Sequence, residues 1–127
     1  MPGAALGVML VKLDLSRGDT MQKISFRKVL PDQVGPLREW MAGLMERREE
    51  VLETFIAETV RSEQAWLIES DEGPVLVFCV EAESLEDAAA AYRTSELTID
   101  IEHQAAMRCF VEDLAPAELL FELSREK

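Results

Sequence analysis

The sequence is poor in the residues that build metal and redox centres. It has one histidine, His103, and two cysteines, Cys79 and Cys109, which are far apart and form no Cys-x-x-Cys motif. Structural zinc sites usually take four nitrogen or sulfur ligands, so this inventory argues against a dedicated zinc site, whereas oxygen ligands for another cation stay open. We expect no metal and no cofactor, and two small buried thiols in a reducing compartment.

Positive charge and long apolar runs are also scarce. Lys and Arg number 13 against 25 Asp and Glu, which gives a formal net charge of -12 at pH 7. Such a charge repels nucleic acid and anionic membrane surfaces at long range. No apolar run approaches the roughly 20 residues that cross a bilayer. We therefore expect a cytoplasmic protein with no nucleic-acid and no membrane partner. Phosphate-binding glycine motifs, nucleophile elbows and kinase signatures are absent as well.

The chain length of 127 residues leaves room for one domain, which we place at residues 21–127. Residues 1–20 form a separate N-terminal extension. Its mildly apolar stretch from Ala4 to Leu10 lacks the basic region of a signal peptide. Three interpretations stay open: translation starts at Met21 and the extension is not native, the extension adds an edge strand over Val8–Leu15, or it is a disordered arm.

Hydrophobic periodicity predicts the order strand, helix, strand, strand, helix pair, strand. In the first strand Ile24 and Phe26 alternate with Ser25 and Arg27, the period of a half-buried strand. The expected elements are a strand at 23–29, one long helix at 37–57, a hairpin of strands at 60–69 and 75–80, helices at 84–93 and 99–113, and a last strand at 118–123. This order predicts an α+β, ferredoxin-like βαββαβ domain with a four-stranded antiparallel sheet and helices on one face.

The strand at 75–80 predicts a homodimer. Its residues are apolar on both faces, so the sheet face without helices needs a cover. A second copy of the chain provides that cover most simply, because a two-fold pairing buries the same patch on both subunits. We expect the chain to pair with itself through this open sheet face.

Arg48 is the most informative residue of the predicted long helix. Its neighbours three and four positions away are all apolar, so a guanidinium there would interrupt a buried stripe. Either Arg48 points inward and is paired with a carboxylate or a ligand, or it extends along the helix edge to solvent. In the first case it could bind an anionic ligand group.

Three further residues could form a catalytic group. His103 lies in the apolar stripe of the last helix, and Asp100 lies one turn earlier, where its carboxylate could orient the imidazole as a general base. Glu63 shares a strand face with Ala65 and could supply a second carboxylate. Two of them also have a structural interpretation: His103 as a satisfied core histidine and Glu63 as a solvated strand residue.

The two tryptophans, Trp40 and Trp66, complete the candidate site. We weigh them as ligand-binding residues against a role as anchors of the core or of the dimer interface.

The chain resembles a bacterial family of uncharacterised proteins with the dimeric α+β barrel architecture. The resemblance extends over residues 23–123 and is carried by Arg38-Glu39-Trp40, by the stretches 45–52 and 81–88, by Val60 with Glu63, and by Ile99-Asp100 with His103. Leu97-Thr98 stands where a His-Pro pair is expected. The resemblance implies the fold and the homodimer. Distant barrels of this architecture include cofactor-free monooxygenases, muconolactone-type isomerases and ligand binders, which implies a cavity for a small organic molecule.

Two hypotheses for the function follow. In the first, the chain is a homodimer that binds a small molecule, or a cofactor-free enzyme acting on a small organic anion, with Arg48 holding the anion and His103 moving a proton. In the second, Arg48, Glu63, Asp100 and His103 form a buried structural network in a protein that works by interaction. An enclosed polar cavity beside these side chains would favour the first hypothesis, and a dry, filled core the second.

Overall fold

The computed structural model describes residues 8–15, 18–115, 117–123 and 125. The elements follow in the order β1 (Val8–Leu15), β2 (Gly18–Val29), α1 (Val34–Glu46), α2 (Arg48–Glu58), β3 (Val60–Ser70), β4 (Gly73–Ala82), α3 (Leu85–Arg93), α4 (Thr98–Phe110) and β5 (Val111–Asp113). None of these helices combines the length and the apolarity that a membrane span requires.

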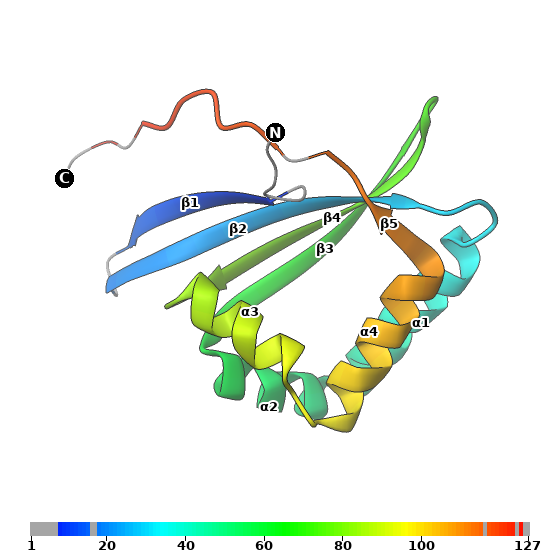
Figure 1. The fold of residues 1–127 in the computed structure, drawn as a ribbon, viewed down its shortest axis with the longest axis horizontal. Helices are drawn as coiled ribbons and strands as arrows, with labels where there is room; N and C mark the ends of the chain where they lie inside the picture. The colour runs from blue at the N-terminus through cyan, green and yellow to red at the C-terminus, as the bar shows by residue number, and fades with distance from the viewer. Residues whose placement is uncertain (1–7, 16–17, 116, 124, 126–127) are drawn as a thin grey trace.

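The strands form one antiparallel sheet, and the four helices lie on one of its faces (Figure 1). The four long strands run in the order β1-β2-β4-β3, and the short β5 pairs with β2. From β2 onward the chain therefore alternates as strand, helix pair, strand, strand, helix pair, strand. The predicted α+β fold of ferredoxin-like type is confirmed.

The hairpin of β3 and β4 is confirmed, and so is the central position of β4 between β2 and β3. Gly73 begins β4 with a φ of 116°, a conformation that favours glycine and lets the chain reverse in a tight turn. The predicted N-terminal cap of α3 is also present, because the Ser84 hydroxyl accepts a 3.2 Å hydrogen bond from the Asp87 backbone N–H.

The prediction of one long helix over 37–57 is wrong, because the chain breaks at Arg47 into α1 and α2. Arg47 has φ -109° and ψ 35°, outside the helical range. Its N–H donates both to the Gly43 carbonyl at 3.2 Å and to the Leu44 carbonyl at 3.0 Å, which tightens the last turn of α1. The break lets α1 pack beside α4 while α2 turns toward α3 (Figure 1).

The prediction of a last strand over 118–123 is also wrong. The helix expected over 99–113 ends at Phe110, the strand β5 follows at once, and residues 117–123 have no regular structure. Leu120 and Phe121 are 82 % and 78 % exposed. The physical reason lies at the edge of β2, which a last strand would need: β1 already pairs with that edge from Gly18 to Ser25.

The N-terminal extension therefore contributes an edge strand over Val8–Leu15, one of the three interpretations of the sequence. Its strand β1 forms an antiparallel hairpin with β2, with Leu15 opposite Gly18 and Val8 opposite Ser25. Residues 1–7, 16 and 17 lie outside the described part of the chain.

The core consists of two separate apolar clusters. The larger one joins β2, α1, β4 and β5 through Val29, Leu37, Leu76 and Val111, all at most 8 % exposed. The smaller one joins β4 to α3 through Ala82, Leu85 and Ala88. Packing is therefore tight at both ends of the space between helices and sheet, and the middle of that space is less completely filled.

The first strand of the ferredoxin-like unit, β2, presents its polar residues to the helices. Ser25 is only 4 % exposed, and Lys23 and Arg27 lie on the same face as Ser25. Ile24 and Phe26 consequently point to the face of the sheet that carries no helix. A strand that turns lysine and arginine toward the interior is costly unless the interior has polar partners there.

Candidate functional site

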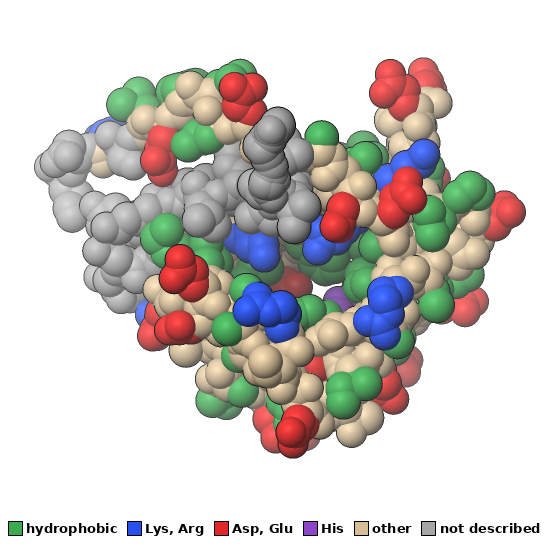
Figure 2. All heavy atoms as spheres, in the orientation of Figure 1, with side chains coloured by type: hydrophobic (Ala, Val, Ile, Leu, Met, Phe, Trp, Pro, Cys, Tyr) green, Lys and Arg blue, Asp and Glu red, His purple; other side chains and the backbone are tan. Residues whose placement is uncertain are grey.

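A cavity of about 430 Å³ lies between the sheet and the helices. Most of its wall is apolar, and Figure 2 shows the molecule hollowed on this face, with a histidine side chain visible inside the hollow. The polar side chains that line it come from both layers of the fold: Lys23, Ser25 and Arg27 on β2, Thr54 and Glu58 on α2, Glu63 on β3, Tyr92 on α3, and Asp100 and His103 on α4.

Two buried carboxyl groups meet at this cavity. Glu58, on the last turn of α2, is 9 % exposed, and Asp100, in the first turn of α4, is 6 % exposed. Their side chains are close enough to share a hydrogen bond. Oε2 of Glu58 and Oδ2 of Asp100 have no hydrogen-bond partner among the described residues. Burial, followed by the charge of Asp100, raises the pKa of Glu58 to about 8.

The local structure explains why the proton of this pair lies on Glu58. Asp100 lies at the N-terminus of α4, where the free backbone N–H groups and the helix dipole favour a carboxylate. Glu58 lies at the opposite kind of end, the C-terminus of α2, which Thr59 closes in the left-handed conformation with a φ of 58°. The proton of the pair is therefore held on Glu58, whose pKa is raised.

His103 is oriented by Trp40. The indole Nε1 of Trp40 donates a 2.8 Å hydrogen bond to Nδ1 of His103, and the two rings stack with centroids 5.8 Å apart. Burial lowers the pKa of His103, and the nearby charge of Asp100 offsets that effect only in part. Since Nδ1 accepts, the neutral imidazole carries its proton on Nε2.

This arrangement differs from the predicted Asp100–His103 pair. The hydrogen bond that holds the imidazole comes from Trp40 on α1, whereas the carboxyl of Asp100 lies beside that of Glu58. His103 and Asp100 still line the same cavity. The imidazole is thus a neutral hydrogen-bond donor rather than a base primed by a carboxylate.

Glu63 and Lys23 face each other across the sheet side of the cavity. Desolvation and the charge of Asp100 raise the pKa of Glu63, although its side chain at the edge strand β3 remains exposed, so solvent weakens the effect. Burial, then the neighbouring Arg27, lowers the pKa of Lys23, while Glu63 acts in the opposite sense. Arg27 forms an ion pair of 3.3 Å with Asp113. The cations of the cavity therefore already have acidic neighbours.

None of the three predicted ligand-binding residues, Arg48, Trp40 and Trp66, lines the cavity. Arg48 is exposed at the first position of α2, because the break at Arg47 turns it away from the interior, so the expectation of an inward, paired Arg48 is wrong. Trp66 is 57 % exposed on the open sheet face and donates a 3.2 Å hydrogen bond to Gln64. Strand alternation places it opposite to Ala65, which does line the cavity.

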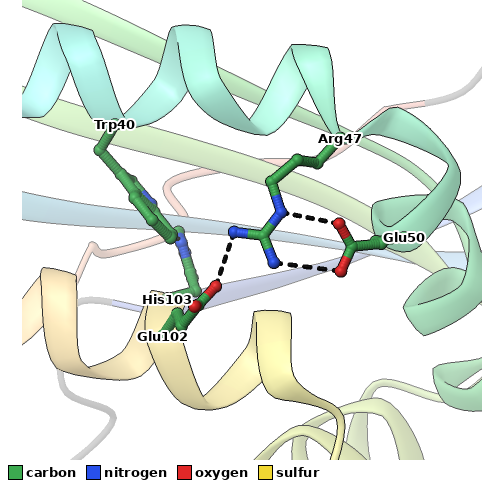
Figure 3. A network of polar contacts seen from close by, with 5 residues as sticks. All are labelled: Trp40, Arg47, Glu50, Glu102 and His103. Carbon is green, nitrogen blue, oxygen red and sulfur yellow. Dashed lines mark hydrogen bonds and ion pairs between the residues drawn. The ribbon is translucent and has the colours of Figure 1, made fainter.

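The neighbouring Arg47 has the ion pairs that were considered for Arg48. Its guanidinium binds Glu50 through two hydrogen bonds of 2.7 and 3.0 Å and Glu102 through one of 2.6 Å (Figure 3). Glu50 belongs to α2 and Glu102 to α4. Arg47 therefore ties the corner between α1 and α2 to the helix that carries Asp100 and His103.

Glu58, Lys23, Arg27 and Tyr92 are cavity residues that the sequence did not single out. Glu58 lay just beyond the predicted helix end. The inner face of α2 carries Thr54 and Glu58 beside Val51 and Phe55, while Ile56 is 82 % exposed, so the apolar pattern of this helix does not mark its inner face. On β2 the alternation shows only that the polar residues share one face of the strand. It does not show which face the helices cover.

The described residues include no cluster of three or more His, Cys, Asp or Glu side chains arranged to hold a metal ion.

Comparison with known proteins identifies a family. No curated protein matches the sequence. The model of a family of unknown function, DUF6176, matches residues 22–127, which include every cavity residue named above. The chain belongs to this family of unknown function.

Proposed function

We propose that the chain is a small-molecule-binding protein whose ligand occupies the cavity between the sheet and the helices. The observation that carries this proposal is a cavity of about 430 Å³ with apolar walls, into which a few polar groups converge. That combination is typical of binding sites for small organic molecules. One buried oxygen each of Glu58 and Asp100 has no hydrogen-bond donor in the described part of the chain, which supports the proposal because a filled structural core leaves few such groups.

The competing structural network has less support. It required Arg48 as the buried cation, and Arg48 is exposed. It also required the polar groups to satisfy one another, whereas the hydrogen bond of His103 comes from Trp40. A network that leaves buried oxygens without donors is less stable than an apolar core of the same volume.

The prediction of an organic anion as the ligand rested mainly on Arg48, and Arg48 does not line the cavity. The cavity holds the acids Glu58, Glu63 and Asp100, and its cations Lys23 and Arg27 already face acidic groups. The charge distribution thus favours a ligand that brings hydrogen-bond donors.

A second candidate function is a cofactor-free enzyme that moves protons within this cavity. The specific observation in its favour is that a carboxyl with a raised pKa, Glu58, and a neutral imidazole, His103, line the same space. Groups with shifted pKa values in one pocket are typical of acid and base catalysts. Binding is the part of this function that can be tested first.

We also propose that the molecule is a homodimer through its open sheet face. Phe26, Val77 and Trp66 lie side by side across β2, β4 and β3, on the face opposite to the cavity. Trp66 is 57 % exposed and Ile68, on the same face of β3, is 50 % exposed, and a second copy is the simplest cover for this apolar surface.

Ligand-observed NMR with compact aromatic and alicyclic molecules tests the binding proposal. Ala89 lines the cavity from α3, whereas Ala42 is exposed on α1, so Ala89→Phe fills the cavity and Ala42→Phe is a matched control. We expect a subset of molecules to bind the natural chain and Ala42→Phe but not Ala89→Phe. Absence of any binding, or equal binding to both variants, would refute the proposal.

A further inference from the structure

Resting on the binding function proposed above, we propose that the Glu58–Asp100 pair recognises a protonated amine at one end of the ligand. Both carboxyls line the cavity, both are more than nine-tenths buried, and one oxygen of each lacks a hydrogen-bond partner among the described residues. An ammonium group has three N–H donors and one positive charge, which is what two adjacent carboxylates lack.

The charge balance of the pair supports a cation rather than a neutral ligand. Two carboxyls in contact and out of water cannot both ionise without a cation, so the free protein keeps one proton between them. An ammonium group can supply the positive charge of that proton. The ligand R–NH3+ enters, Glu58 ionises, and its proton leaves to solvent. The net charge of the site is the same before and after binding, and the ammonium N–H groups replace the lost proton as donors to the pair.

The other charged and titratable groups facing the pair fit this assignment. Glu63, on β3, adds negative charge near the pair, so it would repel an anionic ligand. Lys23 and Arg27 face the site from β2, but their neighbours Glu63 and Asp113 offset their charge. His103 on α4 is neutral, and Tyr92 on α3 keeps its hydroxyl proton because burial raises its pKa.

The rest of the cavity indicates the other end of the ligand. Its wall is made by side chains such as Met41, Leu44, Phe55, Phe78 and Met107, which offer no hydrogen bonds beyond the weak thioether acceptors. A short alkyl or aryl group would bury its apolar surface there. The chemical class is therefore a small primary amine with a compact hydrocarbon body.

Isothermal titration calorimetry with three probes of one shape tests this assignment. The probes are cyclohexylmethylamine, cyclohexylmethanol and cyclohexanecarboxylate. At pH 7 we expect the amine to bind about tenfold more tightly than the alcohol, or better, because the amine makes charge-assisted hydrogen bonds to the pair. The carboxylate should bind more weakly than the alcohol.

The proton that leaves Glu58 gives a second readout that needs no variant. The observed binding enthalpy of the amine should change between two buffers of different ionisation enthalpy by the amount for up to one released proton, whereas that of the alcohol should not change. Amine affinity should also fall as the pH is lowered from 8 to 6, since the proton then competes with the ammonium group for Glu58.

Variants separate the pair from the remainder of the cavity. Glu58→Gln and Asp100→Asn should remove the preference for the amine and leave binding of the alcohol within about threefold, while the exposed Glu53→Gln should change neither. Should a variant not fold, the probe series and the proton release of the natural chain still decide the question.

The outcomes distinguish the two proposals. Equal affinities for amine and alcohol, or no proton release, would overturn the amine site while leaving the binding function intact. Binding of neither probe, together with a negative fragment screen, would overturn the binding function itself.

Discussion

Trp40 and His103, on the separate helices α1 and α4, are joined by a 2.8 Å hydrogen bond from the indole Nε1 to the imidazole Nδ1. The bond assigns a function to Trp40 without placing it in the cavity wall. It fixes the ring of the only histidine in the chain and directs the proton of the neutral imidazole to Nε2.

Trp40→Phe should release His103 from its single tautomer. The ring keeps a stacking partner but loses the hydrogen bond, so we expect a mixture of the two neutral tautomers and a loss of stability of about 1 kcal/mol or somewhat more. Long-range nitrogen–proton NMR of the one histidine measures the tautomer directly. An unchanged Nε2–H tautomer in the variant would show that another group orients the ring.

Glu58 should make the protein less stable as the pH rises. Its pKa in the folded state, about 8, lies above the ordinary value of 4.5, so the folded chain holds a proton that the unfolded chain has lost. The stability therefore decreases between about pH 4.5 and pH 8, by up to about 1.4 kcal/mol per pH unit for one proton.

Urea unfolding of the natural chain and of Glu58→Gln at several pH values measures this effect. His103, whose pKa is lowered, acts with the opposite sign below its ordinary pKa of 6.5, so the quantity to compare is the difference between the two chains. We expect the difference to grow in favour of Glu58→Gln as the pH rises, and Glu53→Gln to follow the natural chain. Parallel curves for the natural chain and Glu58→Gln would contradict the assignment.

The adjacent arginines should behave differently although the sequence makes them look alike. Arg47 bridges Glu50 and Glu102, whereas Arg48 is exposed. We expect Arg47→Ala to lower the melting temperature and to broaden the NMR signals of α4, and Arg48→Ala to do neither. High salt should reduce the difference, since these ion pairs lie near the surface. Equal effects of both variants would remove the special role of Arg47.

The open sheet face should control the oligomeric state. Trp66→Glu places a charge in the middle of the proposed interface and should convert a dimer to a monomer, as measured by light scattering after size exclusion. Ile56→Glu is a matched control, because Ile56 is 82 % exposed on α2, on the other side of the molecule. A natural chain that is monomeric at high concentration would refute the dimer.

Removal of residues 1–20 should free the edge of β2 for the C-terminal segment. β5 pairs with β2 in the register Arg27 opposite Asp113. Continued past Asp113, this register places Leu119 opposite Met21, at an edge that β1 now occupies.

We therefore expect the amides of 117–123 to exchange with solvent more slowly in the chain that starts at Met21 than in the full chain. Hydrogen exchange with mass spectrometry measures both chains under the same conditions. Equal exchange of this segment in both chains would show that β1 does not displace a strand.

Local patterns were enough to predict most of the elements. Turn chemistry predicted the β3–β4 hairpin and the cap at Ser84, and period-2 alternation predicted β2, because these signals involve neighbours in the chain. Patterning also named His103, Asp100 and Glu63, three residues that the structure places around one cavity. It did not name Glu58, whose significance comes from a partner on another helix.

The sequence by itself determined the fold class, the net negative charge and the order of strands and helices, since composition and periodicity are properties of the chain alone. Only the tertiary structure decided which face of β2 is covered, which arginine is paired and which carboxyl meets Asp100. Periodicity shows that Ser25 and Arg27 share a face, but packing of the four helices decides that this face is the inner one. Likewise, one residue outside the helical range at Arg47 turns Arg48 to solvent and brings Glu58 to Asp100. Such long-range contacts depend on how the elements are arranged in space, which no local pattern contains.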